Sequence, residues 1–409
     1  MTSTDPLSLP PASPSVPASV TRPAVPVEAG AARRRLKVVF MIDRILDDMG
    51  GTEGQVMKLV RGLQALADIE LLVLQDSPWI RAQPSSDALR FTVLDMSGGP
   101  KKARFWRGLA ALVRLLRQHR PDVVHTFFPI ANIVGAVAAR LAGVPAVVGS
   151  RRDYGYWMTP GYLRATRLAN RLVGHIVTNA PEVKRFTVSK EGFPAERIEV
   201  IYNGLELGRL RLGAPDLGLK ARLGIPAHHK VVALVANFKP IKRQDTLVEA
   251  FAQLCCERDD VTLMFVGGSA DPYYTEVRQQ IDRLGLGRRV CVTRAPGGEI
   301  ANYLSFVDVG CNCSESEGLS NAVMEYMGAG VPCVISSGGG NKDLVSHGVN
   351  GLLFDVGDAA TLAAHLRRLL ADPAQARRLA DTAARRLEAE MSMPVILQRF
   401  DSFYRRILA

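Results

Sequence analysis

The stretch SESEGLSNAVMEYMGAGVPCVISSGGG, residues 314–340, contains the pattern that decides the fold of the second half of this chain. An apolar run that ends at Cys311 comes just before it and is typical of a buried strand. Ser320 can cap the helix that follows, because its hydroxyl can accept an N–H of the first turn. Gly330 and Pro332 end that helix, and a further strand begins at once. Such a loop directs free N–H groups and the positive end of a helix dipole at its ligand, which suits a diphosphate.

Two carboxylates stand eight positions apart in this stretch. Glu317 opens the loop, and Glu325 lies in the predicted helix. Carboxylates beside a diphosphate site are suited to accept hydrogen bonds from hydroxyl groups. The stretch therefore predicts a site for a nucleotide sugar, which the other motifs must support.

The size and composition of the chain indicate a globular protein with two domains. A chain of 409 residues, 47% hydrophobic and 22% charged, is too long for one ordinary core. Its longest apolar runs, such as Ile130–Leu141, are too short to span a membrane. The six cysteines form no Cys-x-x-Cys pair, which favours reduced thiols in a cytoplasmic protein.

Strands alternate with helices along the chain after a Pro/Ser/Ala-rich start. Residues 1–32 lack the pattern of a secretory signal and are predicted to be a disordered tail. The alternation predicts an α/β fold of two Rossmann-like, doubly wound parallel sheets, at residues 33–208 and 209–390. Residues 391–409 form a last amphipathic segment. Two such halves are expected to face a central cleft in which a ligand binds.

The net charge of +11 is concentrated in the first half. Residues 31–211 contain 28 Lys and Arg against 16 Asp and Glu, whereas residues 212–409 contain 22 of each. This asymmetry predicts an anionic partner for the first domain. The segment Lys101–Arg120 is a basic amphipathic helix with Trp106 near its start, which suits an anionic membrane surface. An ordinary solvated surface helix is the alternative.

Four positions in the first half are candidates for contact with a substrate. Gly51 belongs to a glycine loop between strand and helix, which would let the backbone approach a phosphate, although a tight turn without ligand has the same pattern. His125, which we expect at the end of a strand, would hydrogen-bond a substrate if it faces the cleft. A buried His125 would only satisfy neighbouring groups. Asp153 and Arg151 are candidates for acceptor binding, although Asp153 could instead pair with an adjacent arginine.

A basic loop in the second half follows a strand and precedes a helix. Lys239, Lys242 and Arg243 could supply positive charge to a diphosphate leaving group, and a solvated loop is the alternative. The chain has no Asp-x-Asp pair to hold a metal ion between diphosphate oxygens. We therefore expect no metal and no other cofactor, with the basic loop and the helix dipole taking that role.

Together these motifs resemble the family-4 glycosyltransferases (glycosyl transferases group 1), retaining enzymes of the two-domain GT-B fold. The resemblance covers about residues 36–408, and the paired-glutamate stretch is its most specific part. The motifs occur in the family's order: GGTE at Gly50, DVVH at Asp122, VIYNGLE near Asn203, the lysine loop at Lys242, EGLSNAVMEYMGAGVPCV at Glu317 and NGLLF at Asn350.

The resemblance implies a role for each matching residue. Glu317, Lys242 and His125 would be catalytic, on the donor sugar's hydroxyls, the diphosphate and the transferred sugar respectively. The implied donor-binding residues are Gly51, Lys239, Gly318, Leu319, Ser320 and Glu325, with Glu325 on the ribose. The final helix would pack back on the first domain, as in the family.

One departure from the family pattern concerns the second cation of the diphosphate site. Many members carry Arg five positions before the lysine, where this chain has Asn237. Lys239 is the expected substitute. Asp343 stands where many members have Glu, which is a conservative change.

The expected function is transfer of a sugar from a nucleotide sugar, UDP-linked by preference, to a glycan or lipid-linked acceptor in cell-surface polysaccharide synthesis. The protein would be cytoplasmic, with a peripheral position at the inner membrane face. One alternative is the same fold acting on a small soluble acceptor. A protein that binds nucleic acid is a third alternative, based on the pI of about 9.5, but no recognition motif supports it.

Overall fold

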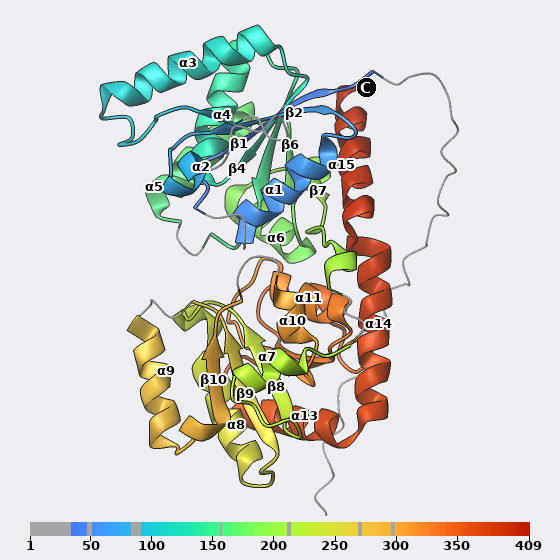
Figure 1. Cartoon of the computed structure of the whole chain (residues 1–409). Coiled ribbons are helices and arrows are strands. Elements are labelled where there is room, and N and C mark those ends of the chain that lie inside the picture. Colours follow the sequence, from blue (N-terminus) through green and yellow to red (C-terminus); the bar gives the residue numbers. More distant parts are fainter. Residues whose placement is uncertain are drawn as a thin grey trace, which may run out of the picture. The chain divides into compact units, whose positions relative to one another are not determined.

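The computed structural model describes residues 34–46, 51–82, 91–155, 158–210, 214–268, 272–295 and 299–409. The predicted tail at residues 1–32 and Gly50 of the glycine loop lie outside the described residues. The chain from Arg35 to Ala409 forms one compact unit. This unit contains two separate parallel sheets (Figure 1).

The first sheet has seven strands in the order β3-β2-β1-β4-β5-β6-β7. All of its strand pairs are parallel. The strands are β1 (Lys37–Ile42), β2 (Asp68–Val73), β3 (Phe91–Val93), β4 (Val123–Phe127), β5 (Ala146–Arg151), β6 (His175–Thr178) and β7 (Ile198–Val200).

The second sheet has six strands in the order β10-β9-β8-β11-β12-β13. These strands are also parallel throughout. They are β8 (Lys230–Val235), β9 (Val261–Val266), β10 (Val290–Thr293), β11 (Val309–Asn312), β12 (Cys333–Ser336) and β13 (Leu352–Phe354). The α/β fold class with two doubly wound parallel sheets is therefore confirmed.

Helices connect the strands, as parallel pairing requires, because each strand must return to the same edge of its sheet. Those linked to the first sheet are α1 (Gly51–Leu63), α2 (Pro78–Ala82), α3 (Ala103–His119), α4 (Pro129–Ala142), α5 (Pro160–Ala169) and α6 (Pro181–Phe186). Those of the remaining chain are α7 (Leu217–Arg222), α8 (Gln244–Cys255), α9 (Pro272–Arg283), α10 (Ile300–Leu304), α11 (Asn321–Ala329), α12 (Asn341–Leu344), α13 (Ala359–Ala371), α14 (Pro373–Met391) and α15 (Met393–Leu408).

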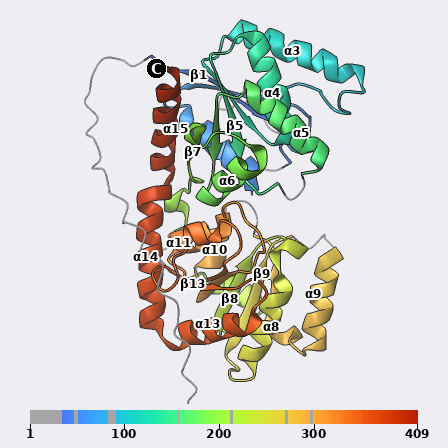
Figure 2. The ribbon, with the colours of Figure 1, turned by 180° about the vertical axis from the view of Figure 1, so that it is seen from behind.

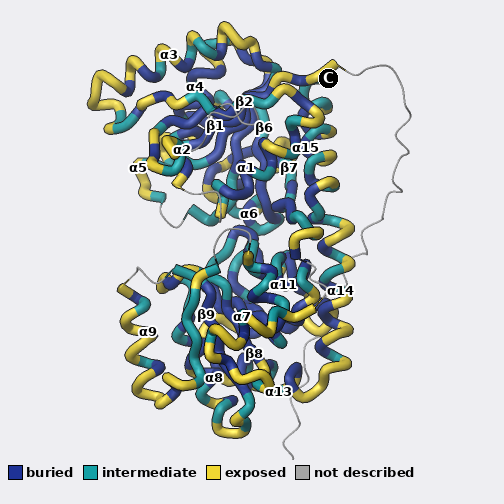
Figure 3. The backbone as a smooth tube through the Cα atoms, in the orientation of Figure 1, coloured by how far each residue is buried: buried dark blue, intermediate teal, exposed yellow. Residues whose placement is uncertain are grey.

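Strand β1 shows why the sequences of the central strands are continuous apolar runs. Its residues alternate between two cores: Val38, Phe40 and Ile42 belong to one, and Val39 and Met41 to the other. Successive side chains of a strand point to opposite faces, and helices cover both faces of this sheet. Strand β1 is consequently buried from Val38 to Ile42, within the dark centre of the first sheet in Figure 3.

The last two helices divide between the two sheets (Figure 2). Helix α14 packs against α11, whereas α15 inserts Ile396, Phe400, Phe403 and Tyr404 into the core beside β1. This confirms that the C-terminal helix packs on the first domain. The domain boundaries at residues 208 and 390 stay predictions. In the described part of the chain, no helix combines the length and the apolar character needed to cross a membrane.

Candidate functional site

The loop between β11 and α11 is built as the sequence predicts. The Ser320 hydroxyl accepts an N–H from Val323 at 3.4 Å and receives an amide proton from Asn312 at 3.1 Å. Gly330 ends the helix at φ 71°, a conformation that favours glycine. Among the residues that the structure describes, no acceptor pairs with the backbone N–H groups of Gly318, Leu319 or Ser320. The start of α11 therefore presents free N–H donors together with the positive end of its dipole.

Glu317 and Lys242, both predicted to be catalytic, contact each other in this structure. Glu317 Oε1 accepts from Lys242 Nζ at 2.5 Å and from Ser314 Oγ at 2.8 Å. The two side chains are only 13% and 24% exposed, so little solvent screens the pair. The structure thus brings together two residues that lie 75 positions apart. Each charge neutralises the other in this structure.

Glycines let this loop pack tightly against its surroundings. A Cβ on Gly318 would lie 1.9 Å from the carbonyl oxygen of Arg152, which follows β5 in the first half of the chain. A Cβ on Gly340 would lie 2.0 Å from the carbonyl oxygen of Gly318. The Gly340 N–H donates to the Glu317 carbonyl at 2.8 Å. Only glycine fits at these two positions, so the loop that carries Glu317 touches the backbone of Arg152.

Glu325 is half-buried on α11. Burial raises the pKa of its carboxyl from 4.5 to about 7, and the positive charge of Lys58 on α1 opposes that rise. Its carboxyl group has no hydrogen-bond partner among the described residues. Gly51, which begins α1 at φ 58°, lies nearby through its carbonyl, which accepts from Asn321 Nδ2 at 3.5 Å. The predicted ribose and phosphate contacts are therefore positioned around α11, and their roles stay predictions.

The three cations of the basic loop have different neighbours. Lys242 faces Glu317, whereas Arg243 is held by Asp245 and Glu315. Lys239 is exposed and has no partner in the described part of the chain. Asn237 Oδ1 accepts the N–H of Gly268 at 2.7 Å. The asparagine that departs from the family pattern therefore joins the loops that follow β8 and β9.

His125 does not lie where the sequence suggested. It occupies the middle of β4, is 0% exposed, and has both ring nitrogens bound. Nδ1 contacts the Tyr404 hydroxyl at 2.7 Å and Nε2 contacts the Ser150 hydroxyl at 2.8 Å. Burial lowers its pKa to about 3, so the imidazole is neutral. The expectation that it ends a strand is wrong, and of the two environments considered for it the structure shows the buried one, because Tyr404 of α15 covers it. No ring nitrogen is left for a sugar in this structure.

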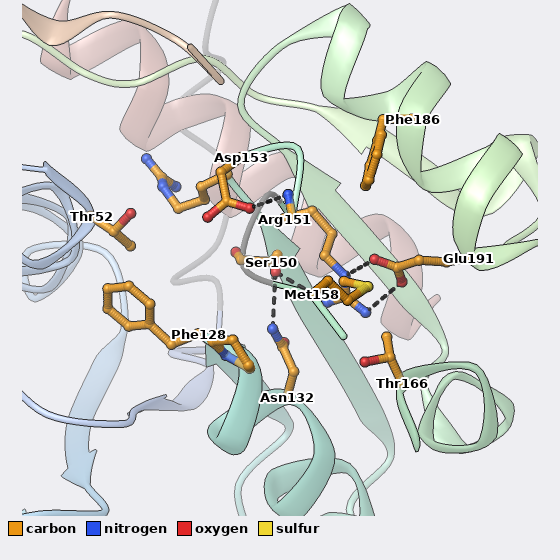
Figure 4. A pocket seen from close by; sticks show the side chains of 13 residues that line it. Thr52, Phe128, Asn132, Ser150, Arg151, Asp153, Met158, Thr166, Phe186 and Glu191 are labelled. Atoms are coloured by element: carbon orange, nitrogen blue, oxygen red, sulfur yellow. Dashed lines mark hydrogen bonds and ion pairs between the residues drawn. The ribbon is translucent and has the colours of Figure 1, made fainter. Parts of the chain in front are cut away.

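The first half contains a pocket at the carboxyl ends of β4 and β5 (Figure 4). About 520 Å³ of space lies between its walls, and part of this volume is open to solvent. The lining combines apolar, hydroxyl and charged side chains: Thr52, Phe128, Pro129, Asn132, Ser150, Arg151, Arg152, Asp153, Gly155, Met158, Thr166, Phe186 and Glu191. The ends of parallel strands are where ligands bind in such sheets.

Both predicted acceptor residues line this pocket. Arg151 makes a bidentate ion pair with Glu191, at 2.7 Å and 2.9 Å, and also donates to Asn170. The Asp153 carboxylate accepts the N–H of Gly155 at 2.8 Å. The Glu191 side chain is 1% exposed, so the pair forms a rigid wall of the pocket. The charge of Arg151 is therefore already compensated.

Unusual backbone conformations meet at the same pocket. Phe128 has φ 70° and ψ 162°, a region that a residue with a side chain adopts at a cost of roughly 1–3 kcal/mol. Glu191 ends a π-helical turn, Thr187–Glu191, and such turns are frequent at functional sites. Neither feature has a signal in the sequence that would have revealed it.

An amide network that the sequence did not predict connects the two halves. Asn203 Nδ2 donates to Asn321 Oδ1 at 2.6 Å, and Gln55 Nε2 approaches the same oxygen at 3.5 Å. The N–H of Gly204 donates to Gln55 Oε1 at 3.2 Å. Asn321 directly follows the capping Ser320, so its position beside the predicted loop was the only available signal. In the part of the chain that the structure describes, no three His, Cys, Asp or Glu side chains form a metal site. Metal independence stays a prediction.

The fold and this site define a class of protein: a two-domain GT-B protein, with the capped loop and the Lys242–Glu317 pair in one half and a pocket in the other. Comparison with known proteins supports this class. The model of Glycosyltransferase Family 4 matches residues 49–209, and that of Glycosyl transferases group 1 matches residues 218–386. The chain belongs to the family-4 glycosyltransferases and is a glycosyltransferase.

Its relatives differ in the substrates that their names state. A GDP-mannose-dependent alpha-mannosyltransferase of Mycolicibacterium smegmatis is 28% identical, over 91% of this chain and 98% of the relative. A D-inositol 3-phosphate glycosyltransferase of Thermobispora bispora is 27% identical, over 80% and 83%. The solved structure of Anabaena HepE in complex with UDP has a TM-score of 0.78 at 24% identity, covering 90% of this chain and 99% of that one. This likeness shows the shared fold.

Proposed function

We propose that this chain is a retaining glycosyltransferase that moves a sugar from a nucleoside diphosphate, UDP by preference, to a glycan or lipid-linked acceptor in cell-surface polysaccharide synthesis. The observation that carries the donor assignment is the loop before α11. It combines free N–H groups at residues 318–320 with the Lys242–Glu317 pair. Hydrogen-bond donors and a cation are what a diphosphate needs, and a carboxylate suits sugar hydroxyls.

Catalysis would depend on positioning and on stabilising charge as it develops. The bond from the anomeric carbon to the diphosphate oxygen breaks, and its electron pair stays on the diphosphate. The acceptor hydroxyl attacks the same face of the sugar, and its proton passes to that phosphate oxygen. Lys242 would release part of its attraction to Glu317 and stabilise the leaving group. Glu317 would orient the sugar through its hydroxyls. We propose that no metal ion is required.

The pocket of Figure 4 is the proposed acceptor site. Phe128 and Phe186 supply apolar faces, and Asp153 supplies a carboxylate. Aromatic faces pack against the apolar side of a sugar ring, and polar groups read its hydroxyls. The pocket lies beside the donor loop, because Arg152 both lines the pocket and touches Gly318. This arrangement would bring acceptor and donor together.

A donor screen tests the proposed function. Release of nucleoside diphosphate should appear with one of several UDP- and GDP-sugars when a membrane extract supplies the acceptor. Glu317→Gln should lose most of that release while remaining folded. The anomeric configuration of the product, determined by NMR, should match that of the donor. If no donor is turned over, or if the configuration is inverted, the proposal is wrong.

Helix α3 supports an acceptor at an anionic membrane surface on the cytoplasmic side. Phe105, Leu112 and Leu116 of α3 are buried, and α3 packs against α4. Its basic residues are exposed, and Trp106 is 57% exposed near the start of the helix. A helix with this exposed face can bind anionic lipids.

Co-sedimentation with vesicles that contain an anionic lipid tests this. Replacing Lys101, Lys102, Arg104 and Arg107 by glutamine should abolish binding. If the unchanged protein does not bind, a small soluble acceptor is the better hypothesis.

A further inference from the structure

Arg151 and Arg152 are adjacent, but their surroundings differ. Arg151 is neutralised by Glu191. The Arg152 guanidinium donates from Nη2 to Asn203 Oδ1, and its Cζ lies 6.0 Å from the centre of the Phe127 ring. No carboxylate of the described residues forms an ion pair with it. Arg152 is thus a cation whose contacts are an uncharged amide and an aromatic ring.

This cation is kept in a costly environment. Protein surrounds the guanidinium closely enough that burial lowers the pKa of Arg152 to about 10. It remains protonated at neutral pH, so its charge is not removed. Buried charges in proteins are ordinarily paired, because an unpaired charge loses its hydration without compensation. The side chain also lines the pocket, so a ligand can reach it. These features indicate that the missing partner is an anion that arrives with the substrate.

The position of Arg152 identifies the anion. Its carbonyl oxygen touches Gly318 of the donor loop. Its guanidinium binds Asn203, which in turn donates to Asn321, the first residue of α11. The cation is thus two hydrogen bonds from the helix N-terminus that we assign to the donor diphosphate. A charge at this point would be close to the leaving group.

The donor half contributes few free cations to that diphosphate. Lys242 is paired with Glu317, and Arg243 is paired with two carboxylates. Lys239 is exposed and has no partner among the described residues. A nucleoside diphosphate carries more than one negative charge, so a cation from the first half would add to the compensation that Lys239 and Lys242 supply.

We propose that Arg152 is a catalytic residue that binds the diphosphate of the donor from the first half of the chain and stabilises the leaving nucleoside diphosphate. The inference rests on the proposed function. As the bond between the anomeric carbon and the phosphate oxygen breaks, the added negative charge on that oxygen is met by the guanidinium. Arg152 thereby adds a cation from the first half to those of the basic loop.

Binding of UDP and GDP, and of uridine and guanosine, tests the proposal by isothermal titration calorimetry. Arg152→Gln should weaken binding of the preferred diphosphate roughly 10- to 100-fold, because a hydrogen bond to a charged group is lost. Binding of the matching nucleoside should stay the same. Arg152→Lys should restore part of the affinity. Arg377→Gln, at an exposed position of α14, serves as the control and should match the unchanged protein.

Turnover completes the test. Arg152→Gln should lower kcat with the nucleotide sugar, whereas a structural role alone would not distinguish the diphosphate from its nucleoside. If Arg152→Gln binds the diphosphate as tightly as the unchanged protein and raises only the KM of the acceptor, the inference is overturned, and the anion belongs to the acceptor. If the unchanged protein binds neither diphosphate and turns over no donor, the proposed function itself fails, and this inference fails with it.

Discussion

Replacing Glu325 by glutamine should stabilise the free protein at pH 8 and weaken its binding of the nucleoside diphosphate. Burial raises the pKa of this carboxyl from 4.5 to about 7. Between these values the folded protein binds a proton that the unfolded chain has released. The free energy of unfolding therefore falls as the pH rises from about 4.5 to about 7. Glutamine has nearly the same shape and never ionises, so it removes this dependence.

The expected magnitude follows from the two pKa values. A tenfold change in proton affinity is worth about 1.4 kcal/mol. The ionised Glu325 should thus cost about 3 kcal/mol of unfolding free energy at pH 8, and less than about 1 kcal/mol at pH 5. Glu325→Gln should recover most of this cost at pH 8. The attraction of Lys58 is already included, since it opposes the rise without cancelling it.

Urea unfolding at pH 5 and pH 8 measures the effect. The midpoint for Glu325→Gln should exceed that of the unchanged protein at pH 8 and nearly coincide with it at pH 5. Glu276→Gln, at an exposed position on α9, is the control for loss of a negative charge. Calorimetry at pH 8 should show weaker diphosphate binding by Glu325→Gln, because the ionised carboxylate is proposed to hold the ribose hydroxyls. The reasoning is refuted if Glu325→Gln and the unchanged protein have equal urea midpoints at pH 8, or if the variant's midpoint is higher by the same amount at both pH values.

Three further predictions concern single contacts. Lys242→Ala should reduce nucleoside diphosphate release more than about 100-fold, because the cation on the leaving group is lost. In urea unfolding it should also lower the unfolding free energy by about 1–3 kcal/mol, because Glu317 loses its partner. Gly318→Ala should lower kcat/KM at least tenfold in the same release assay, because its Cβ would lie 1.9 Å from a backbone carbonyl oxygen. Tyr404→Phe should lower the unfolding free energy by about 1 kcal/mol and leave kcat unchanged, because His125 loses one hydrogen bond in the core.

Each of these predictions has a result that contradicts it. Near-normal turnover by Lys242→Ala would remove the lysine from the site. Gly208→Ala, whose Cβ would meet nothing within 4 Å, is the control for Gly318→Ala, and equal activity of the two variants would show that the loop can move. A loss of kcat in Tyr404→Phe without loss of stability would indicate that His125 acts on the substrate.

The fold could be predicted because it depends on local patterns. The central strands of a doubly wound sheet are buried on both faces, so their apolar runs are visible without knowledge of their neighbours. The cap at Ser320 and the end of α11 at Gly330 were predicted for the same reason, since both involve residues a few positions apart. The last helix was placed correctly from the family resemblance.

The contacts within the candidate site could not be predicted from the sequence, and the roles of its residues stay predictions. Glu317 and Lys242 were both expected in it, yet their ion pair was not, because 75 residues separate them. His125 was misplaced because the residue that covers it, Tyr404, is 279 positions away. No local pattern reports such a distant neighbour.

The two adjacent arginines at the end of β5 show what the sequence and the tertiary structure each contribute. The sequence by itself determined two parallel α/β halves, a loop capped by Ser320, and an excess of positive charge in the first half. It could not tell which of Arg151 and Arg152 has a carboxylate partner, because the two have the same side chain and the same local surroundings. Only the tertiary structure placed Glu191 against the first and left the second beside Asn203. The physical reason is that the free energy of a charge depends on which distant residues surround it, whereas a strand or a helix depends mainly on residues close in the chain.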